Sequence, residues 1–313
     1  MLFMEDLIIN IFVEIDDFYK IVTPLIQKQL IEYNNNYDNG NDDNNNKKEK
    51  RVYKNRIDTL SESEIITILI LYQLSQCKNL KKFYMEYNKI LKMYFPKLPS
   101  YCRFLILERK VNNLLPIFIY HLFGRETGIY YIDSTPLAVC KNQRIHKHKT
   151  FKYIAERGKS SMGWFYGFKL HFIINNKGEL MNFKLTKGNV FDNTVIEDLV
   201  KYNNNNNKQK SNKLFGDKGY ICKEEVKKKL KDNYNIELIT KSRKNMKVKQ
   251  YNNDLSEEDK KLLKKRNLIE TVIGEIKRLT NITTTRIKNV FNYLTNVFSS
   301  ILTYQLKMKM KLS

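Results

Sequence analysis

The sequence predicts an α/β protein in which a mixed β-sheet with flanking helices follows a small all-helical domain. Apolar residues recur at helical spacing between positions 61 and 123, and from Gly128 onward they alternate as they do in strands. Strands then alternate with helices along the rest of the chain, which is typical of helices packed against a mixed sheet. We therefore divide the chain into residues 1–123 and residues 124–313.

The helical domain contains an early insert, at about residues 34–50, that consists mostly of Asn, Asp and Lys. Such a segment buries little apolar surface, so we expect a solvated, disordered loop. After it, Ser61 and Glu64 form a capping-box sequence, in which each side chain can bond to the free backbone N–H of the other residue. This pair predicts a helix that extends to about residue 74.

Two further helices are predicted before the sheet begins. One covers about residues 80–93, and Ser100 caps another that extends toward Phe123. Three short helices are compatible with a helix-turn-helix arrangement, in which Arg103 lies in the first turn of the recognition helix and contacts DNA. A plain helical bundle fits the pattern equally well.

The sheet is predicted to begin with a short strand at residues 129–133. Residues 165–174 alternate as a second strand, and residues 179–186 follow as a third. The Asn and Gly of the intervening segment 176–178 suit a hairpin turn. The later predicted elements are a helix at 193–202, a low-complexity loop at 203–212, a strand at 213–216, a helix at 223–230, a strand at 236–240 and a long helix at 256–279.

The composition favours a polyanionic partner. The formal net charge is +23 and the pI is near 9.6, and nucleic acid is the commonest partner of such a chain. A gene rich in adenine and thymine would give the same excess of Lys, Asn, Ile and Tyr. The longest apolar run, residues 65–71, is too short to span a membrane, and the amino terminus is unlike a secretory signal. We expect a cytoplasmic protein that associates with the nucleoid when it binds DNA.

Three acids are candidates for chemistry on phosphodiesters. Asp133 and Asp217 each end a predicted strand, where residues of an α/β sheet reach its functional edge. Glu270 lies on the late helix beside the apolar stripe, and we expect it to border the sheet instead of facing bulk water. Carboxylates hold the hard cations that phosphodiester transfer requires. Taken singly, each acid is better explained as a strand-end cap or a surface residue, and it is the neighbours of the acids that favour chemistry.

The neighbours of these acids carry a resemblance to a known family. The chain resembles the DDE transposases of bacterial insertion sequences, most closely the insertion-sequence 982 type. Arg266, Glu270 and Lys277 keep the family's spacing, whereas Leu263 stands where the family has Tyr. The other matching segments are residues 132–137 with the basic stretch through Lys159, residues 163–171, residues 188–192 and residues 216–220.

The resemblance implies a ribonuclease-H-like catalytic domain with Asp133, Asp217 and Glu270 as catalytic residues and metal ligands. It implies two Mg²⁺ ions, for which Mn²⁺ can substitute. The expected activity is strand cleavage at insertion-sequence ends followed by strand transfer into target DNA. We expect double-stranded DNA, as element ends and target, to be the partner, and a homodimer on that DNA. We expect no membrane association. We also expect no nucleotide cofactor, because the sequence lacks a Gly-rich phosphate loop with its Lys.

Several cations are candidates for DNA contacts. Arg266 and Lys277 share one helical face with Glu270, although an ordinary salt-bridge ladder gives the same pattern. The segment after Asp133 is strongly basic and predicts a track for the DNA backbone, or else a solvated charged loop. The cations of this basic track are Lys141, Arg144, Lys147, Lys149, Lys152, Arg157 and Lys159.

Other choices remain open at the level of sequence. Lys169 and His171 share a polar strand face and are candidates for active-site support, although a structural His is as good an explanation. Glu275 is the rival of Glu270, but it lies about 140° around the helix, where Arg278 can pair with it. Two rival functions are a hydrolytic nuclease on the same site and a catalytically inactive, transposon-derived DNA-binding protein.

Overall fold

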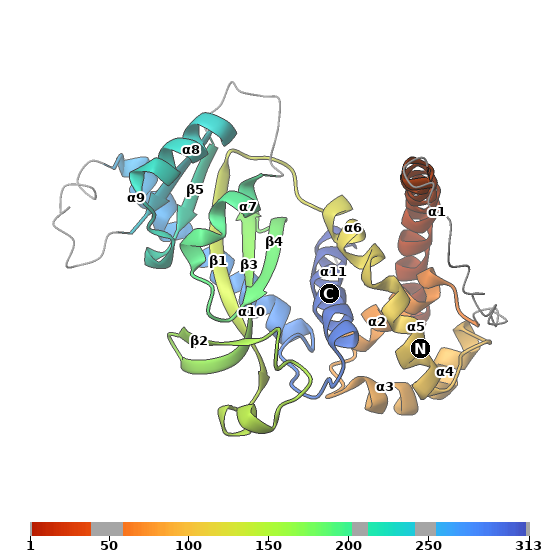
Figure 1. Cartoon of the computed structure of the whole chain (residues 1–313). Helices are drawn as coiled ribbons and strands as arrows, with labels where there is room; N and C mark the ends of the chain where they lie inside the picture. The colour runs from red at the N-terminus through yellow and green to blue at the C-terminus, as the bar shows by residue number, and fades with distance from the viewer. Residues whose placement is uncertain (1, 39–58, 202–211, 242–254, 311–313) are drawn as a thin grey trace. The chain divides into compact units, whose positions relative to one another are not determined.

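The computed structural model describes residues 2–38, 59–201, 212–241 and 255–310. They form two compact units, Met1–Phe118 and Ile119–Ser313 (Figure 1). The described part of the first unit is helical, and the second contains a mixed sheet with flanking helices. This architecture confirms the predicted fold class. No helix within the described ranges is long and apolar enough to cross a membrane.

The first unit is built on contacts between its first two helices. Ile11 and Ile15 of α1 are fully buried, and α2 buries nearly all of its residues because it is apolar around its whole circumference. The Phe18 and Phe118 rings stack at a centroid distance of 4.1 Å. The helices of this unit are α1 (Leu2–Asp38), α2 (Glu62–Leu74), α3 (Leu80–Glu86), α4 (Asn88–Tyr94), α5 (Tyr101–Leu107) and the start of α6 (Leu114–His121).

The predicted capping box is confirmed at the start of α2. The Glu64 amide donates to Ser61 Oγ at 3.2 Å, and the Ser61 amide donates to Glu64 Oε2 at 2.7 Å. The Asn-rich insert was expected to begin at residue 34, but α1 continues to Asp38. Adding a residue to an existing helix costs far less than starting one, so the helix extends into the polar segment. The remainder of that insert, and residues 203–211 of the predicted low-complexity loop, lie outside the described residues. Asn212, expected to end that loop, instead begins a strand.

The helix expected from Ser100 to Phe123 forms as separate pieces. Helix α5 ends at Leu107, a 3₁₀ segment covers Glu108–Asn112, and α6 then begins at Leu114. Pro116 explains the restart, because proline has no N–H to donate and is tolerated only in the first turn of a helix. The helix predicted at 80–93 is likewise divided at Tyr87, which has a ψ of 7°.

The second unit contains a six-stranded sheet among its described residues, in the order β2-β3-β1-β5-β6. Strands β1, β5 and β6 are parallel, whereas β3 is antiparallel to β1. Strands β2 and β4 pair with successive parts of β3 on the edge away from β1. The strands are β1 (Ile129–Cys140), β2 (Glu156–Ser160), β3 (Gly163–Asn175), β4 (Leu180–Lys187), β5 (Asn212–Gly216) and β6 (Ile236–Thr240).

Strand β1 is longer than the five residues predicted, and it runs through Pro136. The parallel pairing of β1 with β5 ends at Tyr131 and Phe215. Beyond Tyr131, the edge of β1 opposite β3 has no strand partner among the described residues, and proline is tolerated on such an edge. The strand β2 was not predicted, because its residues, Glu-Arg-Gly-Lys-Ser, lack an apolar alternation.

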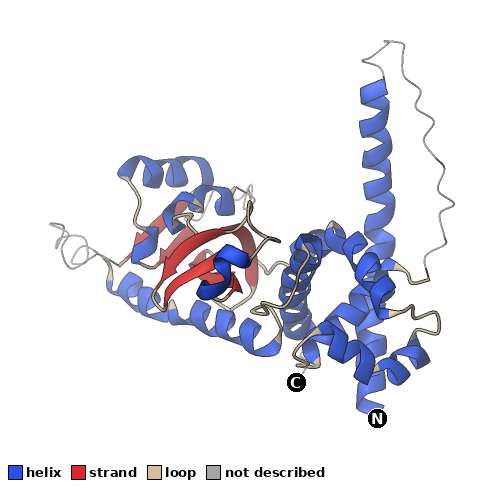
Figure 2. Ribbon diagram, turned by 60° about the horizontal axis from the view of Figure 1, so that its bottom comes forward, coloured by secondary structure: helices blue, strands red, loops and turns tan. Residues whose placement is uncertain are grey.

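Helices cover both faces of the sheet, as Figure 2 shows. On one face, Tyr130 and Ile132 of β1 share a core cluster with α7 (Ile196–Val200) and α8 (Glu224–Tyr234). Because side chains alternate along a strand, Asp133 points to the other face, where α10 (Asn267–Leu279) packs on β1. The remaining long helix of this unit is α11 (Val290–Met310).

The late helix predicted from residue 256 begins as expected, with Ser256 Oγ accepting from the Asp259 amide at 3.1 Å. It then forms two helices, α9 (Glu257–Lys265) and α10, separated at Arg266. Arg266 thus lies at a helix junction with its guanidinium buried. The predicted apolar stripe of Ile269, Val272, Ile273 and Ile276 is buried as expected.

Candidate active site

The two aspartates are brought together by the pairing of β1 with β5. Tyr131 lies opposite Phe215, and two residues farther along each strand come Asp133 and Asp217. Neighbouring strands are about 4.8 Å apart, so this register places the two acids close to each other. Asp217 directly follows β5, as predicted, but the expectation that Asp133 ends its strand is wrong, because β1 continues to Cys140 in its pairing with β3. The β5 strand approaches closely here because Gly216 has no side chain. A Cβ at that position would lie 3.0 Å from Tyr220 Cβ and 3.2 Å from Ile132 Cγ2.

Asp133 is largely enclosed, with a side chain that is 21% exposed. Its Oδ1 accepts from the Ser134 amide at 2.8 Å, and its Oδ2 accepts from Arg266 Nη1 at 2.9 Å. Burial raises the pKa of Asp133, although these two donors oppose the shift and the charge of Asp217 adds to it. A cation placed beside the two aspartates would relieve that repulsion.

Arg266 connects this acid to the third one. Its Nη1 donates to Asp133, and its Nη2 donates to Glu270 Oε1 at 2.5 Å. One guanidinium therefore bridges β1 and the first turn of α10. Lys277 is partly buried on the same helix; burial lowers its pKa, and the charge of Asp133 partly offsets this effect. Arg266, Glu270 and Lys277 thus share a helical face, as predicted, and that face is directed toward Asp133.

Glu270 differs from the expectation in one respect. Its side chain is 55% exposed, so the expectation that it avoids bulk water is wrong. It lies in the first turn of α10, and Arg266 satisfies one of its oxygens. Glu275 points elsewhere and pairs with Arg278 at 2.8 Å and with Lys307 at 3.3 Å, which confirms the predicted Glu275–Arg278 pair.

The donor chemistry of the site fits a hard cation at the aspartate pair. Mg²⁺ takes oxygen ligands, keeps several waters and commonly uses one or two protein carboxylates, as Asp133 and Asp217 supply. Within the described ranges, no three His, Cys, Asp or Glu side chains are grouped to hold a metal ion. The structure therefore brings two of the three predicted ligands together and pairs the third, Glu270, with Arg266.

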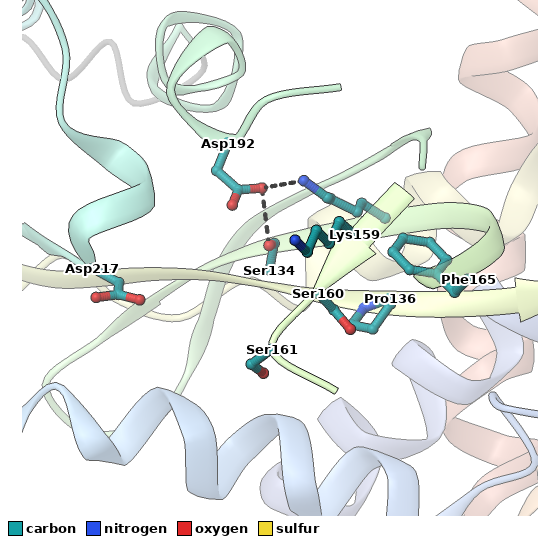
Figure 3. Close-up of a pocket in the computed structure, with 9 residues that line it drawn as sticks. Ser134, Pro136, Lys159, Ser160, Ser161, Phe165, Asp192 and Asp217 are labelled. Atoms are coloured by element: carbon teal, nitrogen blue, oxygen red, sulfur yellow. Dashed lines mark hydrogen bonds and ion pairs between the residues drawn. The ribbon is translucent and has the colours of Figure 1, made fainter. Parts of the chain in front are cut away.

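A cavity of about 410 Å³ lies beside Asp217 (Figure 3). Asp192, which the sequence analysis did not assign to the site, also lines it, and its Oδ1 accepts from Ser134 Oγ at 3.0 Å. The only signal for Asp192 was its position at the end of the matching segment 188–192. The cavity is lined by Ser134, Pro136, Lys159, Ser160, Ser161, Phe165, Lys169, Asp192 and Asp217.

The two predicted support residues lie on the same face as Ser134. Register pairs Ser134 with His171 and Pro136 with Lys169. His171 is fully buried, and burial lowers its pKa to about 4, so the ring is neutral at physiological pH. Its Nε2 lies 2.9 Å from Thr186 Oγ1, and its Nδ1 lies 3.8 Å from Asp192 Oδ1. His171 therefore packs behind the cavity, whereas Lys169 lines it.

The hydroxyl group of Tyr220 lies near the acids Asp133, Asp192 and Asp217. Tyr220 is buried, and its hydroxyl has no hydrogen-bond partner within the described part of the chain. Burial raises the pKa of Tyr220 well above its ordinary value, and the charges of Asp192 and Asp133 add to the effect. The phenol is therefore neutral.

All seven cations of the basic track are exposed. They lie on the segment between β1 and the end of β2, and Lys159 lines the cavity itself. Lys159 Nζ also lies 5.8 Å from the centroid of the Trp164 ring, which is 63% exposed. Arg103 occupies the first turn of α5, behind the Ser100 cap, as predicted. Of the cations of the basic track, Lys159 is the one that lines the cavity beside Asp217.

Comparison with known proteins gives one match. Residues 123–290, more than half of the chain, match the family model described as a transposase DDE domain. This range contains the three predicted acids, which lie on β1, directly after β5 and on α10. No curated protein and no solved structure matches the chain.

Proposed function

The chain belongs to the family of DDE transposases, and from that premise we propose that it cuts DNA at the ends of an insertion sequence and joins those ends to target DNA. The observation that carries the proposal is the β1–β5 register, which brings Asp133 close to Asp217, and Asp217 lines a cavity together with Lys159 of the basic track. An insertion sequence of the 982 type is the proposed source. We also propose that residues 1–123 recognise the element ends and that a homodimer assembles on them.

The acids and the cations have different proposed roles: the acids bind metal ions and the cations bind DNA phosphates. Asp133 and Asp217 would hold Mg²⁺, and Glu270, at its family spacing from Arg266 and Lys277, would be the third acid. When bound, two such ions neutralise the charge that develops on the attacking and leaving oxygens of the phosphodiester. Arg266 holds Asp133 and the α10 terminus in fixed relation through its two hydrogen bonds. The exposed cations of the basic track would neutralise backbone phosphates and align the duplex.

The reaction proceeds in two phosphoryl transfers. In the first, water attacks the phosphorus at the element end, a new P–O bond forms, and the 3′-hydroxyl of the element leaves. In the second, that 3′-hydroxyl attacks a target phosphodiester and displaces the 3′-oxygen of the target strand. One phosphodiester replaces another, so the joining step requires no nucleotide cofactor.

A strand-transfer assay tests the proposal. Labelled duplexes cut from the genomic DNA on either side of the coding sequence are incubated with target plasmid and Mg²⁺ or Mn²⁺. We expect cut ends and joined products. Cutting without joining would establish the hydrolytic nuclease instead, and binding without cutting would establish the inactive DNA-binding protein.

The first prediction concerns the two aspartates. Asp133→Asn and Asp217→Asn should each abolish cleavage, because the amide cannot supply the charge that holds the cation, while DNA binding persists through the cations. Gel-shift and cleavage measurements on the same preparations check both parts. Cleavage retained in either variant, or in wild type with excess chelator, contradicts the assignment.

A further inference from the structure

One lysine in the cavity is held in place by its neighbours. Lys169 Nζ donates to the Val190 carbonyl oxygen at 2.8 Å and to Asp192 Oδ1 at 3.0 Å, and its side chain is 13% exposed. An ammonium group has three N–H donors. The acceptors found within the described residues use two of them, and the third remains for a group that enters the cavity.

Asp192 is itself fixed by three parts of the unit. Its Oδ1 accepts from Ser134 Oγ of β1 as well as from Lys169 of β3. On its other side, Oδ2 faces the turn after β5, where a Cβ at Gly219 would lie only 3.0 Å from it. A side chain at Gly219 would therefore push against the carboxylate. With two donors on one oxygen, this acid is engaged in holding Lys169 and Ser134.

The position of Lys169 suits the binding of an anionic ligand. It lines the same cavity as Asp217, and Lys159 and Ser161 supply further donors on the β2 side of that cavity. A free lysine loses rotamer freedom when it is fixed on a ligand. Because Lys169 is already fixed, it can contact a phosphate without much of that loss.

We propose that Lys169 contacts a non-bridging oxygen of a DNA phosphate in this cavity, and that Asp192 is the positioning residue that holds Lys169 for that contact. The inference rests on the proposed function, and it assigns a role to an acid outside the three catalytic ones. If the ion pair only stabilised the fold, its loss would not change the contribution of a DNA phosphate to binding.

The first arm of the test compares Asp192→Asn, Lys169→Met and the double variant in single-turnover cleavage of the labelled flanking duplex. Asp192→Asn should cleave about 100-fold more slowly, as expected for a displaced catalytic-site group. In chelator it should bind DNA at least as tightly as wild type, because it has lost a negative charge. The double variant should be no slower than Lys169→Met, since Asp192 acts through Lys169.

The Lys213–Asp259 pair provides a matched control. It is also a partly buried Lys–Asp ion pair, with a distance of 2.6 Å, but it lies at the opposite end of β5 from Asp217. Asp259→Asn should cleave within about threefold of wild type. Wild-type cleavage by Asp192→Asn, or slowing in the double variant equal to the product of the two single effects, would overturn the positioning role.

The second arm measures the contact without any chemistry. In a set of duplexes, each with one uncharged methylphosphonate at a different phosphate around the element end, wild type should bind one member more weakly in chelator, and Lys169→Met should show no such difference for that member. An equal loss of affinity in both proteins overturns the contact. This arm does not require cleavage, so it decides the inference even if Asp192→Asn fails to fold. Failure of the proposed function is seen separately, as the absence of cutting by wild type.

Discussion

At the scale of single residues, the arrangement around Arg266 determines how the third acid is held. A guanidinium presents its donors in a rigid, planar fork, and Arg266 uses two of them on acids from β1 and α10. Asp133 is thereby tied to a residue far away in the sequence. Glu270 is held by the same group although more than half of its side chain is exposed.

A paired substitution on α10 tests which acid serves the site. Glu270→Gln should reduce cleavage by at least about 100-fold, as does the loss of groups that hold or orient a metal ligand. Glu275→Gln should change it by less than about threefold, because Glu275 pairs with Arg278 and Lys307 instead. Single-turnover cleavage by the two variants side by side decides the matter. Loss of cleavage in the Glu275 variant alone would reverse the assignment.

His171 predicts a pH dependence of stability. Its pKa is about 4 in the folded chain, below the ordinary value of about 6.5, so the unfolded chain binds the proton first as the pH falls. Stability from this residue should therefore be present above pH 6.5 and lost between pH 6.5 and 4, by roughly 3 kcal/mol. Urea unfolding at several pH values should show this slope in wild type and not in His171→Gln. An unchanged slope in the variant would mean that other groups produce it.

The sequence placed Asp217 correctly after the end of a strand, but Asp133 lies within β1, which continues to Cys140. Asp133 and Asp217 follow apolar strand residues, and their closeness follows from the parallel pairing of those strands. Asp192 escaped prediction because it follows a loop and begins a 3₁₀ turn, so no periodicity distinguishes it from a surface acid. Its role depends on Ser134 and Lys169, which are far from it in the sequence.

At the scale of elements, the cap and turn sequences predicted the structure correctly, whereas the positions at which helices break were not predicted. The Ser61 capping box, the hairpin turn at Gly178 and the strand β6 all formed as predicted. The break between α9 and α10 at Arg266 was not predicted, because the apolar spacing of the sequence continues across it. The strand β2 was also missed, because its pairing with β3 compensates for a polar sequence.

The capping box of α2 yields a prediction for its element. Ser61→Ala should lower the free energy of unfolding of the first unit by about 1 kcal/mol, because the Glu64 amide loses its acceptor at the helix start. Chemical denaturation followed by circular dichroism measures the change. Ser75→Ala, at the other end of α2, is the comparison, and a cap effect requires the Ser61 variant to lose more.

At the scale of the whole molecule, the chain combines a helical unit with a catalytic unit of strongly basic character. The exposed cations between Lys141 and Lys159 carry no sequence information if they contact only phosphates. Discrimination of element ends must then come from another part of the chain, and we assign it to the helical unit with Arg103 in α5.

Residues 119–313 alone should therefore bind DNA without preference for element ends. The truncation keeps Ile119, whose carbonyl oxygen accepts from Gln305 Nε2 of α11. Its affinity should fall steeply with salt, with a log–log slope that drops by about 0.9 for each phosphate contact removed, for example by Lys147→Gln. Titrations with flanking and scrambled duplexes across salt concentrations provide both readouts. A truncated chain that still discriminated would place end recognition in the catalytic unit.

The bridge from Asp133 to Arg266 also bears on the moment at which the protein becomes active during its synthesis. The two residues are 133 positions apart, and at roughly 5–20 residues per second a ribosome needs on the order of ten seconds to cover that interval. Throughout it, Asp133 has been synthesised without the donor that Arg266 supplies at the start of α10. The site is therefore completed only late in synthesis of the chain.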